Sequence, residues 1–212
     1  MDAIGLKAWS GAAAAALTLL AYLPYLWAIL LGDIRPHVFT WIIWGTATML
    51  AFAAALDSGG GWGAWVIGLS AVTSFVVATL AYVKRADVTI SHTDVLFFAV
   101  ALAAVPLWVL AHDPLWAVLL LTLIELLGFG PTFRKTWHAP RSESMTFLVL
   151  LILRNTLILS ALERYTLTTV LFPAAAGAAC LALVAIMIWA TSRRTCVSRK
   201  TGTCFHPTHS LR

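Results

Sequence analysis

The stretch GAAAAALTLLAYLPYLWAILL, residues 11–31, carries no charged side chain and is long enough to cross a lipid bilayer as a helix. A hydrocarbon core about 30 Å thick is crossed by about 20 apolar residues, within a range of about 17–25. Helix is the expected structure because a backbone in lipid must satisfy its own amide groups. Lys7 is the one basic residue before this stretch, and no small-residue cleavage site follows it. We therefore predict a retained first span rather than a signal peptide.

Six further apolar stretches follow the first along the chain. They cover residues 38–56, 63–83, 95–111, 115–130, 146–162 and 168–190. Turn-forming residues separate them, among them the glycine-rich run 57–61. The connections are too short to hold a soluble domain. The sequence therefore predicts one all-α integral membrane domain of seven transmembrane helices over residues 1–190, followed by a disordered basic tail over 191–212.

The composition excludes a soluble globular protein. Of the 212 residues, 61% are hydrophobic and 11% are charged, whereas a soluble domain has about 45–50% apolar and about 25% charged residues. The net charge of +5 does not indicate a nucleic-acid partner, because the basic residues lie in the short gaps and in the tail. The predicted partner of most of this surface is the lipid bilayer.

The basic residues are distributed unevenly between the two sides of the predicted membrane domain. The side of the amino terminus carries only Lys7 and Arg164. The opposite side carries eleven basic residues: Arg35, Lys84, Arg85, Arg134, Lys135, Arg141, Arg193, Arg194, Arg199, Lys200 and Arg212. Because basic loops stay in the cytoplasm, we predict that the amino terminus is outside and the tail is cytoplasmic.

The chain contains an internal repeat. A shift of 107 residues aligns the fifth, sixth and seventh stretches with the first, second and third, and it aligns Pro24 with Pro131. The fourth stretch, residues 95–111, has no partner and becomes a linker helix. A single linker helix makes the repeats parallel. We therefore predict a 3+1+3 arrangement with repeats over about 9–83 and 115–190, facing each other around a cavity for a small solute.

With this layout the chain resembles the PQ-loop and SWEET superfamily of transporters. The similar segments are Pro24-Tyr25 with residues 35–41, RPHVFTW, and residues 131–135, PTFRK, with residues 142–144, SES. In that family a proline–glutamine pair ends the first helix of each repeat, and a basic loop and a serine or threonine follow. Here Tyr25 and Thr132 replace both glutamines. The resemblance implies a divergent branch in the inner (plasma) membrane of a bacterium.

The function implied by the resemblance is transport of a small solute, a sugar or another small polar metabolite, by alternating access between two three-helix bundles. Transporters of nicotinamide riboside share this general fold and use tryptophans, so they are a rival model. The alternative from another class is a non-transporting membrane scaffold or accessory subunit. The substrate, its coupling to protons and the oligomeric state, a homo-oligomer included, stay open.

Two charged residues, Glu125 and Arg154, lie inside predicted spans. A helical rise of 1.5 Å places Glu125 about 9 Å from Pro131 and Arg154 about 12 Å from Thr146, at similar depth. An isolated arginine at this depth costs at least about 2.5–3.5 kcal/mol, so we expect the two to meet. We predict that they and Asn155 form a substrate or proton site. The alternative is a structural ion pair that clamps two spans.

Two further pairs of residues are candidates for function. Trp41 and Trp44 are three residues apart and share a helix face, from which they could stack against a solute or pack against a neighbour. Pro24 and Pro131 each remove a helix hydrogen bond, so they are candidate hinges, or else they mark helix ends.

Other chemistries lack their sequence motifs. The chain has no metal-spaced histidine pair, nucleophile elbow or phosphate-binding glycine loop. We therefore predict no enzyme, no cofactor and no metal. The last span contains no lysine, which excludes a retinal protein. The tail residues Cys196, Cys204, His206 and His209 match no compact zinc module, and we interpret them as part of a solvated tail.

Overall fold

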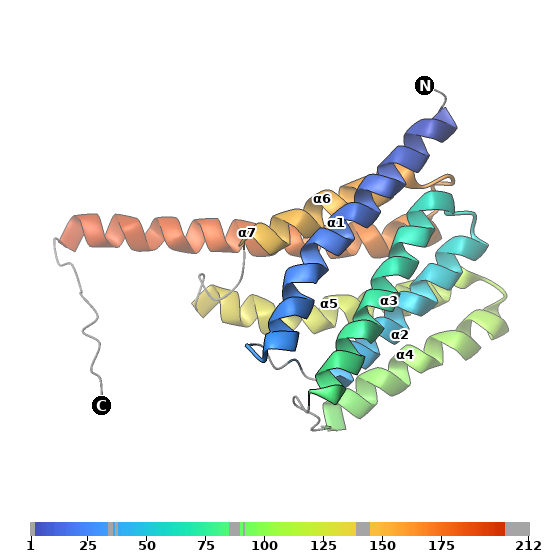
Figure 1. Ribbon diagram of the computed structural model, residues 1–212, viewed down its shortest axis with the longest axis horizontal. Coiled ribbons are helices and arrows are strands. Elements are labelled where there is room, and N and C mark those ends of the chain that lie inside the picture. Colours follow the sequence, from blue (N-terminus) through green and yellow to red (C-terminus); the bar gives the residue numbers. More distant parts are fainter. Residues whose placement is uncertain are drawn as a thin grey trace.

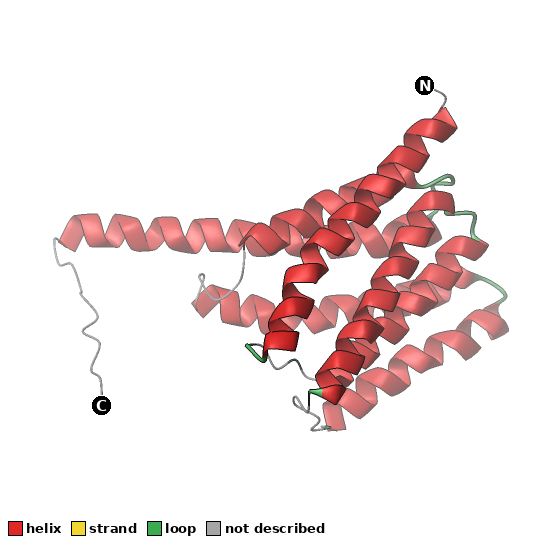
Figure 2. Cartoon of the chain, in the orientation of Figure 1, coloured by secondary structure: helices red, strands yellow, loops and turns green. Residues whose placement is uncertain are grey.

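The computed structural model describes residues 3–33, 36, 38–84, 90, 92–138 and 145–201, and its regular structure is entirely helical across these residues (Figure 2). Seven helices are formed: α1 (Ala3–Leu31), α2 (Val38–Asp57), α3 (Gly61–Val83), α4 (His92–Ala111), α5 (Pro114–His138), α6 (Met145–Ala161) and α7 (Leu167–Thr201). Each helix contains most or all of one predicted stretch. The all-α class and the seven helices are therefore confirmed for the described part of the chain.

Four helices are long and apolar enough to cross a membrane. They are Gly5–Leu31, Val38–Asp57, Gly61–Val83 and Leu167–Ala190. Three shorter apolar helical segments, Val95–Ala111, Pro114–Phe129 and Met145–Ala161, belong to α4, α5 and α6. The last of these has 17 residues, which lies at the lower limit of about 17 for a span. The helices are those of a membrane-embedded protein.

Three helices extend beyond the predicted stretches by more than one helical turn. Helix α1 begins at Ala3, and α5 continues to His138. Helix α7 continues to Thr201, so residues 191–201 are helical where their composition predicted disorder. The reason lies in the sequence, because no glycine or proline interrupts residues 191–201 and Gly202 follows directly. The remainder of the predicted tail, residues 202–212, lies outside the described residues.

The helices pack in a pattern that is repeated within the chain (Figure 1). Helix α3 packs against α1 and α2, and α7 packs against α5 and α6. Between these sets, α1 packs against α6, α2 against α5 and α7, and α3 against α6. If α1, α2 and α3 are exchanged for α5, α6 and α7, each of these pairings becomes another of them. Helix α4 packs against α2 and α5 and has no counterpart.

Glycines allow the helices to approach each other closely. A Cβ atom at Gly45 would lie 2.9 Å from the ring of Phe75, and one at Gly68 would lie 3.1 Å from the ring of Phe52. These two pairs lock α2 against α3. Small residues at helix contacts are typical of packing in membranes, where dispersion contacts replace the hydrophobic effect between helices. The glycines therefore determine how α2 and α3 fit together.

At the end of the molecule where α1 begins, three segments contact one another: the start of α1, the α2–α3 turn and the α6–α7 connection. The backbone N–H of Glu163, in the α6–α7 connection, donates to the carbonyl of Gly60 in the α2–α3 turn at 3.3 Å. The Lys7 ammonium of α1 donates to the carbonyl of Glu163 at 3.2 Å and lies 5.6 Å from the centre of the Tyr165 ring. Gly61 has a φ of 57° and no room for a Cβ beside the Glu163 carboxyl. These contacts close this end of the bundle.

Candidate functional site

Arg154 of α6 reaches across to two other helices. Its Nε donates a hydrogen bond to Thr18 Oγ1 on α1 at 3.0 Å, and its Nη2 donates to Ser70 Oγ on α3. Thr18 is fully buried and Ser70 nearly so, while Arg154 is partly buried. One cation therefore connects α6 with α1 and α3 inside the helical bundle.

The two hydroxyl groups can accept from arginine because their protons are already used. Thr18 Oγ1 donates to the carbonyl of Ala14 at 2.9 Å, and Ser70 Oγ donates to the carbonyl of Val66 at 3.0 Å. A hydroxyl that donates to its own helix keeps its lone pairs free for another donor. The guanidinium is thus held by two neutral acceptors, which take two of its hydrogen bonds without cancelling its charge.

Glu125 of α5 lies near Arg154 but does not form the predicted ion pair with it. Within the described chain, no carboxylate oxygen lies within 4.0 Å of the guanidinium, and Glu125 has no hydrogen-bond partner. The two side chains still interact electrostatically. The expected nearness of the charges is therefore supported, whereas their direct contact is not. The reason is that the guanidinium is hydrogen-bonded to Thr18 on α1 and Ser70 on α3, and so points toward these helices.

Hydroxyl groups surround the two charges. Tyr22 of α1 is hydrogen-bonded to Ser74 of α3 and interacts electrostatically with both Arg154 and Glu125. Thr122, three residues before Glu125 on α5, is buried and its hydroxyl has no partner among the described residues. We call the following group the central polar cluster: Thr18, Tyr22, Ser70, Ser74, Thr122, Glu125 and Arg154.

Trp41 and Trp44 lie beside this cluster as part of an aromatic group. Their rings are 5.4 Å apart between centroids, and Trp41 also contacts Tyr22 at 6.1 Å and Tyr25 at 5.4 Å. A Cβ at Gly128 of α5 would lie 3.0 Å from Trp44 Nε1. The predicted common face of the two tryptophans is confirmed. It packs against α1 and α5, and Tyr22 joins it to the polar cluster.

Asn155 does not join the cluster. Its Nδ2 donates to the carbonyl of Leu151 on the same helix at 2.9 Å. A Cβ atom added at Gly177 of α7 would lie 3.3 Å from the Cβ of Asn155. Consecutive helix residues point about 100° apart, which turns Asn155 toward α7 while Arg154 turns toward α1 and α3. The structure therefore gives Asn155 a packing role between α6 and α7.

The two candidate hinge prolines lie inside helices. Pro24 falls within α1, and α5 continues through residue 131 to His138. Each position is about two turns before the end of its helix. The interpretation that these prolines mark helix ends is therefore wrong, and their role as hinges stays a prediction.

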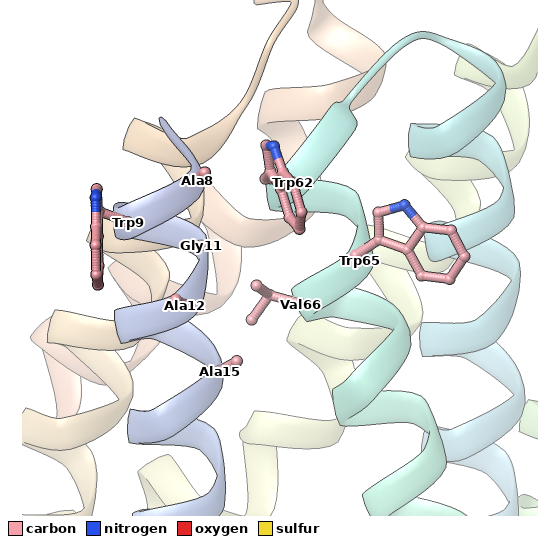
Figure 3. A pocket seen from close by; sticks show the side chains of 8 residues that line it. All are labelled: Ala8, Trp9, Gly11, Ala12, Ala15, Trp62, Trp65 and Val66. Atoms are coloured by element: carbon pink, nitrogen blue, oxygen red, sulfur yellow. The ribbon is translucent and has the colours of Figure 1, made fainter. Parts of the chain in front are cut away.

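A pocket of about 410 Å³ lies elsewhere, between α1 and α3 near the start of α1 (Figure 3). Trp9, Trp62 and Trp65 are among its walls, and each is between 48% and 70% exposed. Exposed tryptophans suit a membrane–water interface. The lining contains no member of the central polar cluster and no charged residue: Ala8, Trp9, Gly11, Ala12, Ala15, Trp62, Trp65 and Val66. This pocket does not suit a polar solute.

The hydroxyl partners of Arg154 are not among the site residues predicted from the sequence. Two signals pointed to them. Ser70 and Ser74 are four residues apart in an otherwise apolar stretch and so share a helix face. In the 107-residue register Thr18 also aligns with Glu125, so the two repeats carry polar groups at the same position.

Removing both acceptors should leave the partly buried Arg154 without these two hydrogen-bond partners. We expect the double variant Thr18→Val, Ser70→Ala to lose about 2–4 kcal/mol of unfolding free energy, the range for an orphaned buried charge. Adding Arg154→Leu should restore most of that loss. Thermal unfolding of the purified variants measures both effects. Thr79→Val is the matched control, because Thr79 is exposed and makes the same kind of bond to Phe75. A triple variant no more stable than the double would contradict this account of the site.

The central polar cluster thus combines a cation held by neutral hydroxyls with a carboxyl group that lacks an ion-pair partner in the described chain. Ionisable groups within membrane segments usually mark a functional site. Among the described residues, no three histidine, cysteine, aspartate or glutamate side chains gather as metal ligands. Comparison of the chain with protein-family models, curated proteins and solved structures finds no match.

Proposed function

We propose that the chain is a small-solute transporter or facilitator in which two three-helix bundles, α1–α3 and α5–α7, move around the central polar cluster. The observation that carries this proposal is Arg154. Its guanidinium belongs to α6 and is hydrogen-bonded to hydroxyls on α1 and α3, across the boundary between the two bundles. A charge retained in a membrane segment without a counter-ion in contact is costly, and a solute pathway is a common reason for retaining one.

The pairing of the helices supports a 3+1+3 arrangement. The exchange of α1–α3 for α5–α7 preserves the set of contacts, and α4 alone lacks a counterpart. Parallel repeats in transporters place the solute site near the middle of the membrane, at the interface between the repeats. The hydrogen bond between Arg154 of α6 and Thr18 of α1 joins the two proposed bundles and supports a site between them. Pro24 and Pro131, at equivalent places in α1 and α5, are the proposed hinges.

The proposed orientation has the amino terminus outside and the tail in the cytoplasm of a bacterial plasma membrane. It follows from the distribution of basic residues, of which Arg35, Arg85, Arg141 and Arg212 lie outside the described residues. In this orientation the contacts of Lys7 and Gly60 with Glu163 close the outer end. Opening toward the outside then requires the α6–α7 connection to separate from the α2–α3 turn.

The proposed solute is a sugar or another small polar metabolite, and Arg154 favours one with an anionic group. Trp41 and Trp44 provide aromatic faces beside the cluster. The same chain is a candidate scaffold or accessory subunit for a specific reason. The pocket between α1 and α3 is apolar and lies apart from the cluster, as expected of a protein that binds lipid or another helix rather than a polar solute.

Cysteine accessibility along α6 separates the two functions. In a variant without Cys180, Cys196 and Cys204, single cysteines are placed at each position from 151 to 158 and treated with a membrane-impermeant thiol reagent. Transport predicts reaction at Leu151 and Ile158, which share the helix face of Arg154. Exposed positions outside that face, such as 153 and 156, are the lipid-facing controls and should stay unreactive. Protection at all eight positions would count against transport.

A further inference from the structure

Both charges of the central polar cluster lack a charged partner in contact. A guanidinium has five N–H donors, and the two hydroxyls that Arg154 contacts are neutral. Glu125 has neither a hydrogen bond nor an ion pair within the described residues. Burying an uncompensated charge is expensive. The site therefore contains one cation and one carboxyl group, neither of them in contact with a group of opposite charge among the described residues.

The separation of the two charges is informative. They interact electrostatically, yet no pair of their nitrogen and oxygen atoms lies within 4.0 Å. If the charges served only to neutralise each other, direct contact would be the better arrangement. A ligand with groups of both signs could accept a hydrogen bond from the guanidinium and donate one to the carboxyl group, each at about 2.8 Å. The arrangement is that of two half-sites of opposite charge.

We infer that the solute is a zwitterion, with its anionic group on Arg154 and its cationic group on Glu125. The class comprises small molecules that carry one group of each sign, such as amino acids and betaines. The Thr122 hydroxyl is buried and has no partner in the described chain, so it can bind a further polar group of the solute. The binding part of this inference stands on the cluster alone, whereas passage of the zwitterion across the membrane rests on the proposed function.

Other solute classes would leave a charge unpaired. A neutral sugar pairs neither Glu125 nor Arg154, a monoanion leaves Glu125 alone, and a monocation leaves Arg154 alone. A site built around polar partners discriminates strongly against ligands that fail to satisfy them. Selectivity for zwitterions is therefore the property that identifies this site.

The first experiment measures thermal stabilisation of the purified wild-type protein in detergent. Four groups of probes are compared: the common amino acids with glycine betaine, acetate with propionate, ethylamine with choline, and glucose with glycerol. We expect at least one zwitterion to raise the unfolding temperature, and none of the other probes to match it. Equal stabilisation by a sugar, a monoanion or a monocation would overturn the inference, as would the failure of every zwitterion.

The second experiment assigns the two half-sites. Glu125→Gln and Arg154→Gln should each weaken zwitterion binding by about 10- to 100-fold, the range for one hydrogen bond to a charged group. Because Glu125→Gln lacks the carboxyl group that pairs the cationic group, this variant should bind a monoanion about as tightly as it binds a zwitterion. Asp57→Asn and Lys84→Gln remove exposed charges at helix ends and should change nothing. If Arg154→Gln does not fold, Arg154→Lys replaces it in the binding measurement, because it keeps the positive charge but loses the planar guanidinium. Unchanged affinity in both half-site variants contradicts the assignment.

Flux through proteoliposomes distinguishes this inference from the proposed function. Binding of a zwitterion with the predicted response of both variants, but without counterflow of that zwitterion, would refute transport and leave the binding site standing. Glucose counterflow without any effect of zwitterions would support transport and refute the zwitterion site. Zwitterion counterflow that is lost in Glu125→Gln and retained in Asp57→Asn is the result expected if both are right.

Discussion

If the chain transports a solute as proposed, Arg154→Leu should abolish transport and leave the protein folded. The fold survives because Thr18 and Ser70 keep their bonds to the carbonyls of Ala14 and Val66, so no hydroxyl is orphaned. Replacing a buried charge by an apolar side chain is often neutral or stabilising, by about 1–4 kcal/mol. Transport should fall by at least about 100-fold, the equivalent of about 2.8 kcal/mol of lost solute binding. Initial uptake rates in proteoliposomes and the unfolding temperature are the two measurements.

Two control variants isolate the role of the guanidinium. Arg164→Leu removes an exposed arginine in the α6–α7 connection and should transport normally. Arg154→Lys keeps a charge but loses the planar fork that reaches both Thr18 and Ser70, so an intermediate rate is expected. An Arg154→Leu protein that folds and transports at the wild-type rate would remove Arg154 from the mechanism. A variant that fails to fold would make the arginine structural.

The helices could be predicted from the sequence because the run of apolar residues sets their length. Residues 11–31 and 168–190 lack any charged side chain, and both are parts of helices in the structure. Helix ends were harder to predict. Polar residues 191–201 continue α7 although they follow the apolar stretch, because an already nucleated helix gains one hydrogen bond for each residue added and no glycine or proline interrupts this segment. Pro131 was predicted near a boundary, and yet α5 continues past it.

The site could be predicted only in part. Glu125 and Arg154 were evident because charge is rare in apolar stretches, and the common face of Trp41 and Trp44 follows from their spacing. The partners of Arg154 were not evident. Thr18 and Ser70 are ordinary residues in membrane helices, since they bond to their own backbone wherever they occur. Only the packing of α6 against α1 and α3 makes their oxygens acceptors for the arginine.

Gly63→Leu should destabilise the protein by about 3 kcal/mol, at the upper end of the range for overpacking. Gly63 is buried on α3 against α6. A Cβ atom there would lie 2.7 Å from the Leu162 side chain and 2.8 Å from the carbonyl oxygen of Ile158. The carbonyl is part of the α6 backbone and cannot move alone, so the two helices must separate. Thermal unfolding of the purified variant measures the loss.

Gly5→Leu is the matched control for this substitution. Gly5 lies in α1 with nothing within 4 Å of its Cβ position, so leucine should be neutral or add up to about 1 kcal/mol through helix propensity. Equal stability of Gly63→Leu and Gly5→Leu would contradict the close approach of α3 and α6.

The same approach of α3 to α6 lies beside the contact of Gly60 with Glu163, which closes the proposed outer end. A change that strains only the closed arrangement favours the open one, and about 2.8 kcal/mol shifts that equilibrium by about 100-fold. Gly63→Leu should therefore increase the reactivity of a cysteine at position 151 toward an impermeant thiol reagent added from outside. If Gly63→Leu is destabilised but this reactivity does not rise, Gly63 has a role in packing only. The α3–α6 contact then does not control closure of the proposed outer end.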